Sequence, residues 1–434
     1  MRESRYNFYV PLEEDDKTLV YNALSNSLIE ADEETVELIK NYRDDYPDSE
    51  KFKKLCNLGF IVGKGFDEIT YLKYSSYQAK FSMDSLSLTI APTLRCNFAC
   101  PYCYEEEQNI SLEESLFSGL NNLVNMHASN KENINIIWYG GEPLLEITTI
   151  SKLTELFKET CEKNNVSYTA GMITNGYLVE DVGIEFFKKN INSHIQITLD
   201  GPPQVHDQRR CLKGGQPTFW KILDGIKMLD KAGFTISLRC NVDRANSAHL
   251  KELINIIKDA SLKHCHVHLG HVETGNKSCD WVDEKYLEID DFASSYTEFA
   301  LLLAQNGLGK IRDGLYPQRN GNYCGACTMN SYVIGPNGDI FKCWNDLGFE
   351  SKRMLNLKSE LKTAADWKNE WDYTMHDVFE IDKCVECKFL PVCLGGCPHF
   401  YLNNGEPKCD KVSFNLESVL KKVYQESLAL EKSS

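Results

Sequence analysis

Three cysteines, Cys96, Cys100 and Cys103, lie close together in the spacing C-x3-C-x2-C. They follow an apolar run, 86–93, that predicts a strand, and they precede the acidic stretch 104–107. Iron–sulfur clusters are held by cysteine thiolates, usually four for each 4Fe–4S unit. A tight loop with this spacing can aim three thiolates at three irons of one cubane cluster. The fourth iron would then lack a protein ligand and could bind another molecule.

The remaining cysteines are also unevenly distributed. Of the 17 cysteines, eleven fall into three groups, at 96–103, 324–343 and 384–409. A secreted protein would use such residues as disulfides, whereas in a reduced compartment metal or redox chemistry is expected. Zinc bound by the first group would need a fourth ligand from a distant part of the chain. Six scattered cysteines are predicted to be buried or incidental thiols: Cys56, Cys161, Cys211, Cys240, Cys265 and Cys279.

Length and charge limit the class of protein. A chain of 434 residues is expected to form two or three domains. The net charge of −16 argues against a nonspecific partner such as nucleic acid or an anionic membrane. No stretch has the apolar length of a membrane span, and the first residues lack a signal-peptide core. These features predict a cytoplasmic protein.

Residues 1–84 are predicted to form a winged-helix-like α+β domain. Strands are expected over 6–12 and within 19–30, and a short wing strand over 60–62. Asp32 and Ser49 are expected to cap two helices between them. This shape suits peptide or nucleic-acid binding, and the acidic composition favours a peptide. A structural cap on the next domain is the alternative.

Residues 85–309 alternate strands and helices, which predicts an α/β fold with a parallel sheet, either an open sheet or a partial (β/α)6 barrel. The spacing Ser111-x-x-Glu114 predicts a capping box at the start of one helix. Six strands are expected, at 86–92, 134–139, 168–174, 194–199, 234–241 and 264–269.

Polar motifs follow successive strands of this region. In such folds the active site gathers at the carboxyl ends of the strands, so these motifs are expected to meet. They are the three-cysteine loop, Gly140-Gly141-Glu142-Pro143, Thr174-Asn175-Gly176, Thr198-Leu199-Asp200-Gly201, and Arg239 with Asn241.

Residues 310–434 are richer in cysteine, glycine and proline. A hairpin is expected around 335–339, with strands over 332–334 and 340–342. The stretch 383–410 has too few apolar residues to hold itself together, which indicates that metal stabilises it. The final stretch, 416–430, predicts an amphipathic helix with a packing role.

Together these motifs resemble the radical S-adenosylmethionine enzymes. In that family the methionine amino and carboxylate groups chelate the open iron, and the reduced cluster splits the sulfonium to give a 5′-deoxyadenosyl radical that abstracts a substrate hydrogen. The resemblance implies that cofactors carry the hard chemistry and the protein places them.

The same resemblance implies roles for residues outside the cluster. The GGEP segment Gly140, Gly141, Glu142 and Pro143 would hold the methionine amino group. Tyr102 would lie beside the adenine, and the other strand-end residues would contact the ribose or the carboxylate. Those are Asn175, Thr198 and Asp200 for the ribose, and Arg210 and Arg239 for the carboxylate.

The later cysteines resemble the SPASM domain of peptide-modifying radical enzymes. The resemblance implies two auxiliary 4Fe–4S clusters, and therefore three clusters in all. Cys327 is either a fourth ligand of the first auxiliary cluster or leaves its iron open to a substrate thiolate. The first cluster would use Cys324, Cys343 and Cys397, and the second Cys384, Cys387, Cys393 and Cys409. Two zinc ribbons are the alternative.

The leading functional hypothesis is a maturase of ribosomally made peptides. The region 1–84 resembles a leader-peptide recognition element, which binds a leader as an added strand. The expected partners are a precursor peptide, leader plus core, and an electron donor such as flavodoxin or ferredoxin. A thioether link is the first choice of product and a carbon–carbon link the second.

Two alternatives remain open. A sulfatase maturase, which makes formylglycine, carries an aspartate directly after the cysteine of the G-x4-C element. Here that position is Trp344, with Asp346 nearby. A zinc-stabilised peptide-binding scaffold without catalysis is the other alternative.

Overall fold

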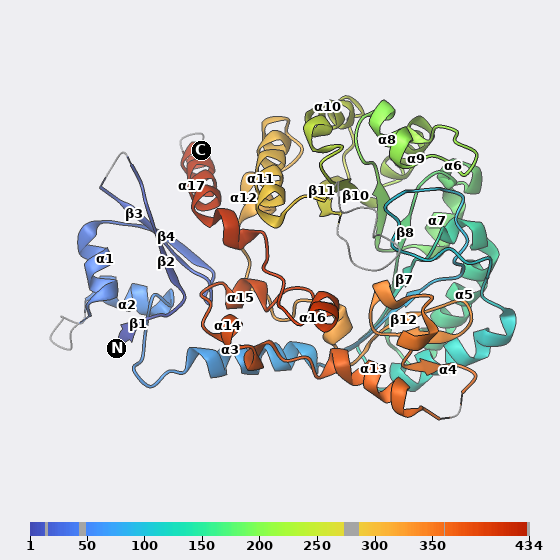
Figure 1. The fold of residues 1–434 in the computed structure, drawn as a ribbon, viewed down its shortest axis with the longest axis horizontal. Helices are drawn as coiled ribbons and strands as arrows, with labels where there is room; N and C mark the ends of the chain where they lie inside the picture. Colours follow the sequence, from blue (N-terminus) through green and yellow to red (C-terminus); the bar gives the residue numbers. More distant parts are fainter. Residues whose placement is uncertain (14–15, 43–48, 273–285, 360, 432–434) are drawn as a thin grey trace. The chain divides into compact units, whose positions relative to one another are not determined.

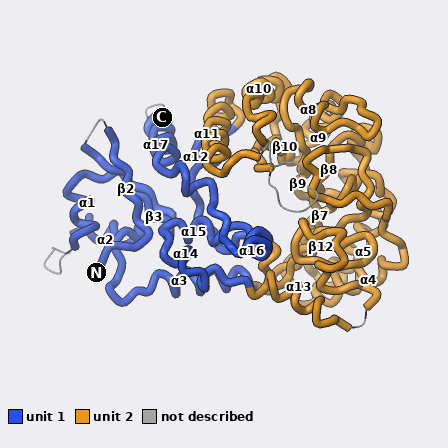
Figure 2. The backbone as a smooth tube through the Cα atoms, viewed as in Figure 1, with its two compact units in different colours: residues 1–81, 309–324, 376–434 blue, residues 82–308, 325–375 orange. Residues whose placement is uncertain are grey.

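The computed structural model describes residues 1–13, 16–42, 49–272, 286–359 and 361–431 (Figure 1). Cys279 lies outside the described residues. The chain forms two compact units (Figure 2): unit 1 comprises 1–81, 309–324 and 376–434, and unit 2 comprises 82–308 and 325–375. Across the described helices, none combines the length and the apolar character that crossing a bilayer requires.

Unit 2 is built on a large mixed sheet. Among the described residues it has nine strands, in the order β11-β10-β9-β8-β7-β6-β12-β13-β14. The seven strands from β11 to β12 run parallel, and β13 and β14 continue antiparallel. The strands are β6 (Ser85–Ile90), β7 (Asn133–Trp138), β8 (Ser167–Thr174), β9 (His194–Thr198), β10 (Thr235–Val242), β11 (Cys265–His271), β12 (Ser331–Ile334), β13 (Asp339–Phe341) and β14 (Leu355–Asn356).

The parallel α/β fold predicted from the sequence is confirmed, and all six predicted strands lie within two residues of β6 to β11. The predicted hairpin is also present, as β12 and β13. Its strand β12 pairs with β6, so it extends the main sheet instead of standing apart from it.

The helices of unit 2 cover the outer side of the parallel strands (Figure 1). Alternate residues of β6 and a helical stripe of α5 share one core cluster, and they are fully buried. This is the pattern expected where one face of a strand meets one face of a helix. The helices are α4 (Phe117–Ala128), α5 (Ile147–Lys163), α6 (Val179–Val182), α7 (Ile184–Asn190), α8 (Pro203–Arg209), α9 (Phe219–Lys231), α10 (Leu250–Asp259), α11 (Ile289–Gln305) and α13 (Ala364–Thr374).

Unit 1 combines both ends of the chain. Its N-terminal part has an antiparallel sheet in the order β2-β3-β4 and a β1-β5 pair. The predicted caps are confirmed: Asp32 accepts from the backbone of Thr35, and Ser49 from that of Phe52. Its elements are β1 (Arg2–Glu3), β2 (Asn7–Pro11), β3 (Thr18–Asn22), β4 (Ser27–Ala31), α1 (Glu33–Lys40), α2 (Glu50–Asn57), β5 (Ile61–Val62), α3 (Glu68–Lys80), α12 (Ile311–Leu315), α14 (Asp382–Val385), α15 (Leu390–Cys393), α16 (Pro398–Asn404) and α17 (Val412–Glu431).

Two local features differ from the sequence-based expectation. The capping box at Ser111 is wrong, because Ser111 forms an isolated bridge with Thr93 and its hydroxyl donates to Glu146 (2.7 Å). The helix begins later, after a 3-10 turn over Glu114–Leu116. Helix α3 was not predicted, since its apolar residues do not form one stripe: Tyr71 and Tyr74 are exposed, whereas Glu68 and Lys80 are buried.

Candidate active site

The three-cysteine loop follows β6 at the carboxyl edge of the parallel sheet. It is held by a short antiparallel contact with 211–213, in which the backbone of Ala99 donates to Cys211 and that of Lys213 donates to Asn97 (3.1 Å each). Burial, together with nearby carboxylates and neighbouring cysteines, raises the pKa of Cys96 and of Cys103 to about 12. The thiols are therefore close enough to disfavour one another's ionisation.

A bound iron–sulfur cluster would remove this repulsion between thiolates, because its positively charged irons stabilise the deprotonated thiols. Among the described residues, no three His, Cys, Asp or Glu side chains are placed to hold one metal ion. The cysteines of a cubane stand farther apart, since each one binds a different iron. The donor set of this loop fits a cluster of that kind.

The two glycines after β7 form a cradle against the chain that leads into the cysteine loop. A Cβ on Gly140 would lie 2.5 Å from the carbonyl oxygen of Thr93, and one on Gly141 would lie 2.3 Å from that of Arg95. Gly140 also has φ +96°, which favours glycine. Only glycine permits the approach through which the backbone of Glu142 donates to Arg95 (2.9 Å).

Glu142 joins the ends of two neighbouring strands. Its carboxylate is fully buried and accepts hydrogen bonds from the Thr174 hydroxyl (2.7 Å), the Asn175 backbone (2.8 Å) and the Leu144 backbone (2.9 Å). Burial is the largest influence on its pKa, which is raised. Pro143 follows, buried, at the start of a 3-10 turn.

Asn175 reaches from the end of β8 to the cysteine loop. Its side-chain amide donates to the Asn97 side chain (2.7 Å), and its Nδ2 lies 3.9 Å from the Cys96 sulfur. Thr198 ends β9 and is buried. Asn175 is thus one of the predicted strand-end residues that the structure places against the cysteine loop.

A second group of polar residues is centred on Tyr102 and Asp200. The Tyr102 hydroxyl donates to Oδ2 of Asp200 and accepts from Nη1 of Arg210 (2.7 Å). The other carboxylate oxygen of Asp200 accepts from the Asn241 backbone (2.9 Å). Asp200 is fully buried, and the Arg209 guanidinium lies beside it, with Nε 3.7 Å from Oδ2.

The two arginines predicted to bind a carboxylate differ in their surroundings. Arg239 donates from Nε to Oδ1 of Asn241 (2.6 Å) and packs across Gly270, where a Cβ would meet the guanidinium at 2.4 Å. Only 8% of the surface of Arg210 is exposed. Its Nε has no hydrogen-bond partner among the described residues. An unpaired buried donor costs stability unless a ligand satisfies it. Arg210 therefore fits an anionic ligand better than Arg239.

Sequence reasoning missed several residues that support this group. They lie in the segment after Asp200, whose only sequence signal is a cluster of basic residues at 206–210. Nδ1 of His206 accepts from the Asp200 backbone (3.2 Å), and its Nε2 contacts the Thr218 hydroxyl (3.1 Å). Burial lowers the pKa of His206 well below its ordinary value, so the ring is neutral and can accept at Nδ1. Arg209 forms a buried ion pair with Asp243 (2.7 Å).

We expect His268 to make the stability of unit 2 acid-sensitive. Burial, with Arg239 nearby, lowers the pKa of His268 to about 4, below its ordinary value of 6.5. The neutral ring therefore stabilises the fold above pH 6.5, and this contribution is lost as the pH falls towards 4. Between pH 7 and 5.5 the wild type should lose about 1 kcal/mol of unfolding free energy that His268→Gln does not lose. Urea unfolding at both pH values measures this, with His194→Gln, on an exposed residue, as the matched control. Equal losses in wild type and His268→Gln would contradict the assignment.

Residues 90–257, which span the cysteine loop and the strand-end motifs, match the radical SAM superfamily. The chain therefore contains a radical SAM domain. It is thus an enzyme of the radical type, and its superfamily uses a 4Fe–4S cluster and S-adenosylmethionine. The three-thiol loop and the unpaired donor of Arg210 fit these two groups.

Curated relatives are similar to this radical SAM enzyme over much of its length. The serine-type anaerobic sulfatase-maturating enzyme of Bacteroides thetaiotaomicron is 26% identical over 70% of this chain and 80% of its own. The cysteine-type anaerobic sulfatase-maturating enzyme of Clostridium novyi is 25% identical over 73% of this chain and 88% of its own.

Solved structures show the same fold. The enzyme anSMEcpe with bound AdoMet and Kp18Cys peptide aligns with a TM-score of 0.64 at 18% identity, over 81% of this chain and 100% of its own. Streptococcus suis SuiB bound to the precursor peptide SuiA aligns with a TM-score of 0.53 at 13% identity, over 95% of this chain and 99% of its own.

The C-terminal part of the radical SAM enzyme is SPASM-like, and unit 1 brings four of its cysteines together. Cys384 is influenced electrostatically by Cys387 and Cys409, and Cys393 by Cys409. Burial raises the pKa of Cys384 and Cys393 to about 11. A Cβ on Gly396 would lie 1.9 Å from the carbonyl oxygen of Lys408, so glycine is needed for the chain before Cys409 to approach this loop.

The other predicted ligands are divided between the units. Cys324 and Cys397 belong to unit 1, and Cys327 and Cys343 to unit 2. Their grouping around one auxiliary cluster stays a prediction.

Proposed function

We propose that this radical SAM enzyme is a peptide maturase. It would abstract a hydrogen atom from a residue of a precursor peptide and join that carbon to sulfur, or as a second choice to carbon. In this proposal 1–84 recognises the leader, 85–309 carries the radical chemistry, and 310–434 holds two auxiliary clusters. SuiB, bound to a precursor peptide in its own structure, aligns with 95% of this chain, and that extent supports a similar layout.

The residues would divide the work as follows. Bound cluster and S-adenosylmethionine supply the radical that removes the hydrogen. Cys96, Cys100 and Cys103 would hold the cluster, and Arg210 would receive the methionine carboxylate. Asp200 accepts a hydrogen bond from Tyr102 and so positions this residue of the same loop.

Forming a thioether requires the loss of two hydrogens from the peptide. One leaves as the abstracted hydrogen atom, and the thiol proton and one further electron must also leave. We propose that the four-cysteine set of unit 1 and a first auxiliary cluster carry this electron towards a redox protein such as flavodoxin or ferredoxin. The same protein class would supply the electron that starts the reaction.

One observation favours crosslinking over formylglycine formation. The position directly after Cys343 is Trp344, whose ring packs on Tyr139 at 4.9 Å between centroids. The nearby Asp346 is 2% exposed and accepts a hydrogen bond from the Tyr373 hydroxyl (2.7 Å). Its carboxylate is thus engaged within the protein, and burial raises its pKa to about 6.

Formylglycine formation is the second candidate. It is favoured by the similarity to sulfatase-maturating enzymes, which covers 70% of the chain at 26% identity. An Asp346 freed from Tyr373 could then serve as the proton acceptor that this reaction needs.

The products distinguish the two candidates. The reduced enzyme is incubated anaerobically with S-adenosylmethionine and two synthetic peptides, one with the cysteine-containing sulfatase motif and one with a cysteine-rich sequence that represents a precursor. We expect 5′-deoxyadenosine and a precursor that has lost two hydrogens and resists thiol alkylation. An aldehyde captured by a hydrazide reagent on the sulfatase peptide would instead establish the second candidate. Absence of 5′-deoxyadenosine with every peptide would contradict both.

A further inference from the structure

One buried carboxylate beside the cysteine loop lies outside the groups assigned to the cluster and to S-adenosylmethionine. Glu105 follows Cys103 by two residues, in the stretch 104–107 that the sequence shows only as acidic. Its Oε2 oxygen is buried and has no hydrogen-bond partner among the described residues. A buried acceptor without a partner costs stability unless a ligand supplies the missing hydrogen bond. Glu105 is therefore a candidate binding group.

Two tyrosines hold this carboxylate in place. The Tyr139 hydroxyl donates to Glu105, which leaves the Tyr104 hydroxyl to donate in the hydrogen bond between the two tyrosines. Tyr139 is 5% exposed and shares a small core with Leu94 and Phe341, and Tyr104 packs against the same core. The carboxylate is thus fixed in apolar surroundings, where a charge interaction is stronger than in water.

The same aromatic group connects Glu105 to a second cysteine-bearing segment of unit 2. The Trp344 ring packs on the Tyr139 ring, with 4.9 Å between centroids, and Trp344 follows Cys343 directly. Trp344 is 39% exposed and Tyr104 is half-buried, so this aromatic group is partly open to solvent. A peptide that meets both cysteine-bearing segments would contact this group.

The charge of Glu105 is not balanced within the described part of the chain. Among those residues its carboxylate forms no ion pair, and the charged group that acts on it electrostatically is the Glu142 carboxylate, which repels it. Buried charges in proteins are normally paired. A positively charged ligand would supply both the missing hydrogen bond and the missing counter-charge.

The α-amino group of S-adenosylmethionine fits Glu105 less well than a cation of the peptide does. The amino and carboxylate groups of the cofactor share one carbon atom, so both must bind close together. Arg210, which is proposed to receive the carboxylate, acts electrostatically on Cys96 and Glu142 but not on Glu105. The peptide is therefore the better source of the cation.

We propose that Glu105 binds a cationic side chain, Lys or Arg, of the substrate peptide. The ammonium or guanidinium group donates to Oε2, while Tyr139 keeps the carboxylate oriented. Because Glu105 lies beside the loop proposed to hold the radical-generating cluster, the contact selects peptides with a basic residue close to the one that loses hydrogen. This inference rests on the proposed peptide maturase function, and it adds a specificity-determining residue and the chemistry that it recognises.

The test compares two short fluorescein-labelled synthetic peptides. Both contain Cys in a Gly-Ser background, and they differ at one central position, which is Lys in one and norleucine in the other. The holoenzyme is kept anaerobic with S-adenosylmethionine and without a reductant, so that no turnover occurs. Fluorescence anisotropy should show that the Lys peptide binds about tenfold more tightly or better. Glu105→Gln keeps the size of the side chain and removes its charge, and it should bind both peptides as the wild type binds the norleucine peptide.

A neighbouring residue provides the matched control. Glu106→Gln removes the same charge from an exposed position of the same acidic stretch, and it should keep the preference for Lys. This control separates a specific site from general attraction to the stretch. Equal binding of the two peptides to the wild type, including no measurable binding of either, would overturn the inference. A preference that survives in Glu105→Gln would do the same.

Two further measurements separate peptide binding from a role in folding or in cofactor binding. Glu105→Leu removes an unsatisfied buried carboxylate, while Tyr139 keeps Tyr104 as a partner. The melting temperature of this holoenzyme variant should therefore rise by about 2 °C or more, whereas a fall would show that Glu105 serves the fold. Equilibrium dialysis should find that Glu105→Gln binds S-adenosylmethionine within about twofold of the wild type. A loss of about tenfold would assign Glu105 to the cofactor and refute the peptide site.

The outcome is separable from that of the proposed function. If the Lys peptide binds through Glu105 but no peptide is ever modified, the maturase proposal fails while the cation site stands. If a precursor peptide is modified and no preference for Lys depends on Glu105, only the inference about Glu105 fails.

Discussion

Alanine at Cys96, Cys100 and Cys103 is expected to abolish 5′-deoxyadenosine formation. The three thiols share one loop, and neighbouring cysteines contribute to the raised pKa values of Cys96 and Cys103, as expected if the three form a single ligand set. With three of the ligands removed, the cluster that this loop is proposed to hold should be lost. Anaerobic assays should show activity at the level of the enzyme-free control, and the iron content should fall by roughly a third if three clusters are present.

The same experiment separates ligation from packing. Cys96 and Cys100 also pack against the main core, so a structural role predicts lower stability with activity retained in the surviving fold. Far-ultraviolet circular dichroism checks that the variant is folded. Cys56→Ala, a half-buried cysteine outside the three groups, is the matched control and should keep both iron and activity. Turnover by the triple variant would refute the central assignment.

The parallel sheet and the positions of its motifs were predictable because strand-like and helix-like patterns alternate along 85–309. Strands such as 168–174 could be read from apolar runs, and a parallel arrangement then placed every following motif at one edge. The Gly-Gly pair was recognisable as a motif. Its physical reason, the close approach of Gly141 to the carbonyl of Arg95, is visible only in three dimensions.

Long-range partners were not predictable in the same way. Tyr102 lies 98 residues before Asp200, and nothing in either local pattern indicates their hydrogen bond. The neutral His206 is a similar case, since its role depends on burial rather than on spacing. The Ser111 prediction failed for a related reason: its hydroxyl is committed to Glu146, far along the chain, and is not available to cap a helix.

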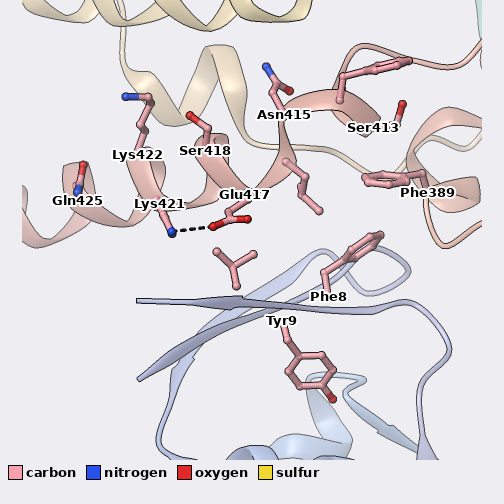
Figure 3. Close-up of a pocket in the computed structure, with 13 residues that line it drawn as sticks. Phe8, Tyr9, Phe389, Ser413, Asn415, Glu417, Ser418, Lys421, Lys422 and Gln425 are labelled. Atoms are coloured by element: carbon pink, nitrogen blue, oxygen red, sulfur yellow. Dashed lines mark hydrogen bonds and ion pairs between the residues drawn. The ribbon is translucent and has the colours of Figure 1, made fainter. Parts of the chain in front are cut away.

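A groove between β2 and α17 (Figure 3) shows how a tertiary contact adds to what an amphipathic sequence pattern predicts. An amphipathic helix at 416–430 predicts packing, and α17 does pack, with Leu416 and Val423 buried. Its exposed residues also form half of a groove whose other half lies near residue 8. A surface built from both ends of the chain has no continuous sequence signal.

Asp200→Ala should destabilise unit 2 by about 3–5 kcal/mol, because it leaves buried cations without their counter-charge. Asp200 is fully buried and close to Arg209, and through Tyr102 it is connected to Arg210. Asp200 also accepts a hydrogen bond from the backbone N–H of Asn241, which would lose this partner in the variant. Urea unfolding of the two proteins under anaerobic conditions measures the difference.

Two further variants decide whether charge or shape causes the loss. Asp200→Asn keeps the size of the side chain but not its charge. If the loss of counter-charge for the arginines causes the destabilisation, this variant should lose most of the same free energy of unfolding. Asp224→Ala removes a carboxylate that is 53% exposed and paired with Lys227, and should change stability by no more than about 0.5 kcal/mol. If Asp200→Asn were as stable as the wild type, the carboxylate would act only by filling space. The electrostatic account of Tyr102, Arg209 and Arg210 would then be wrong.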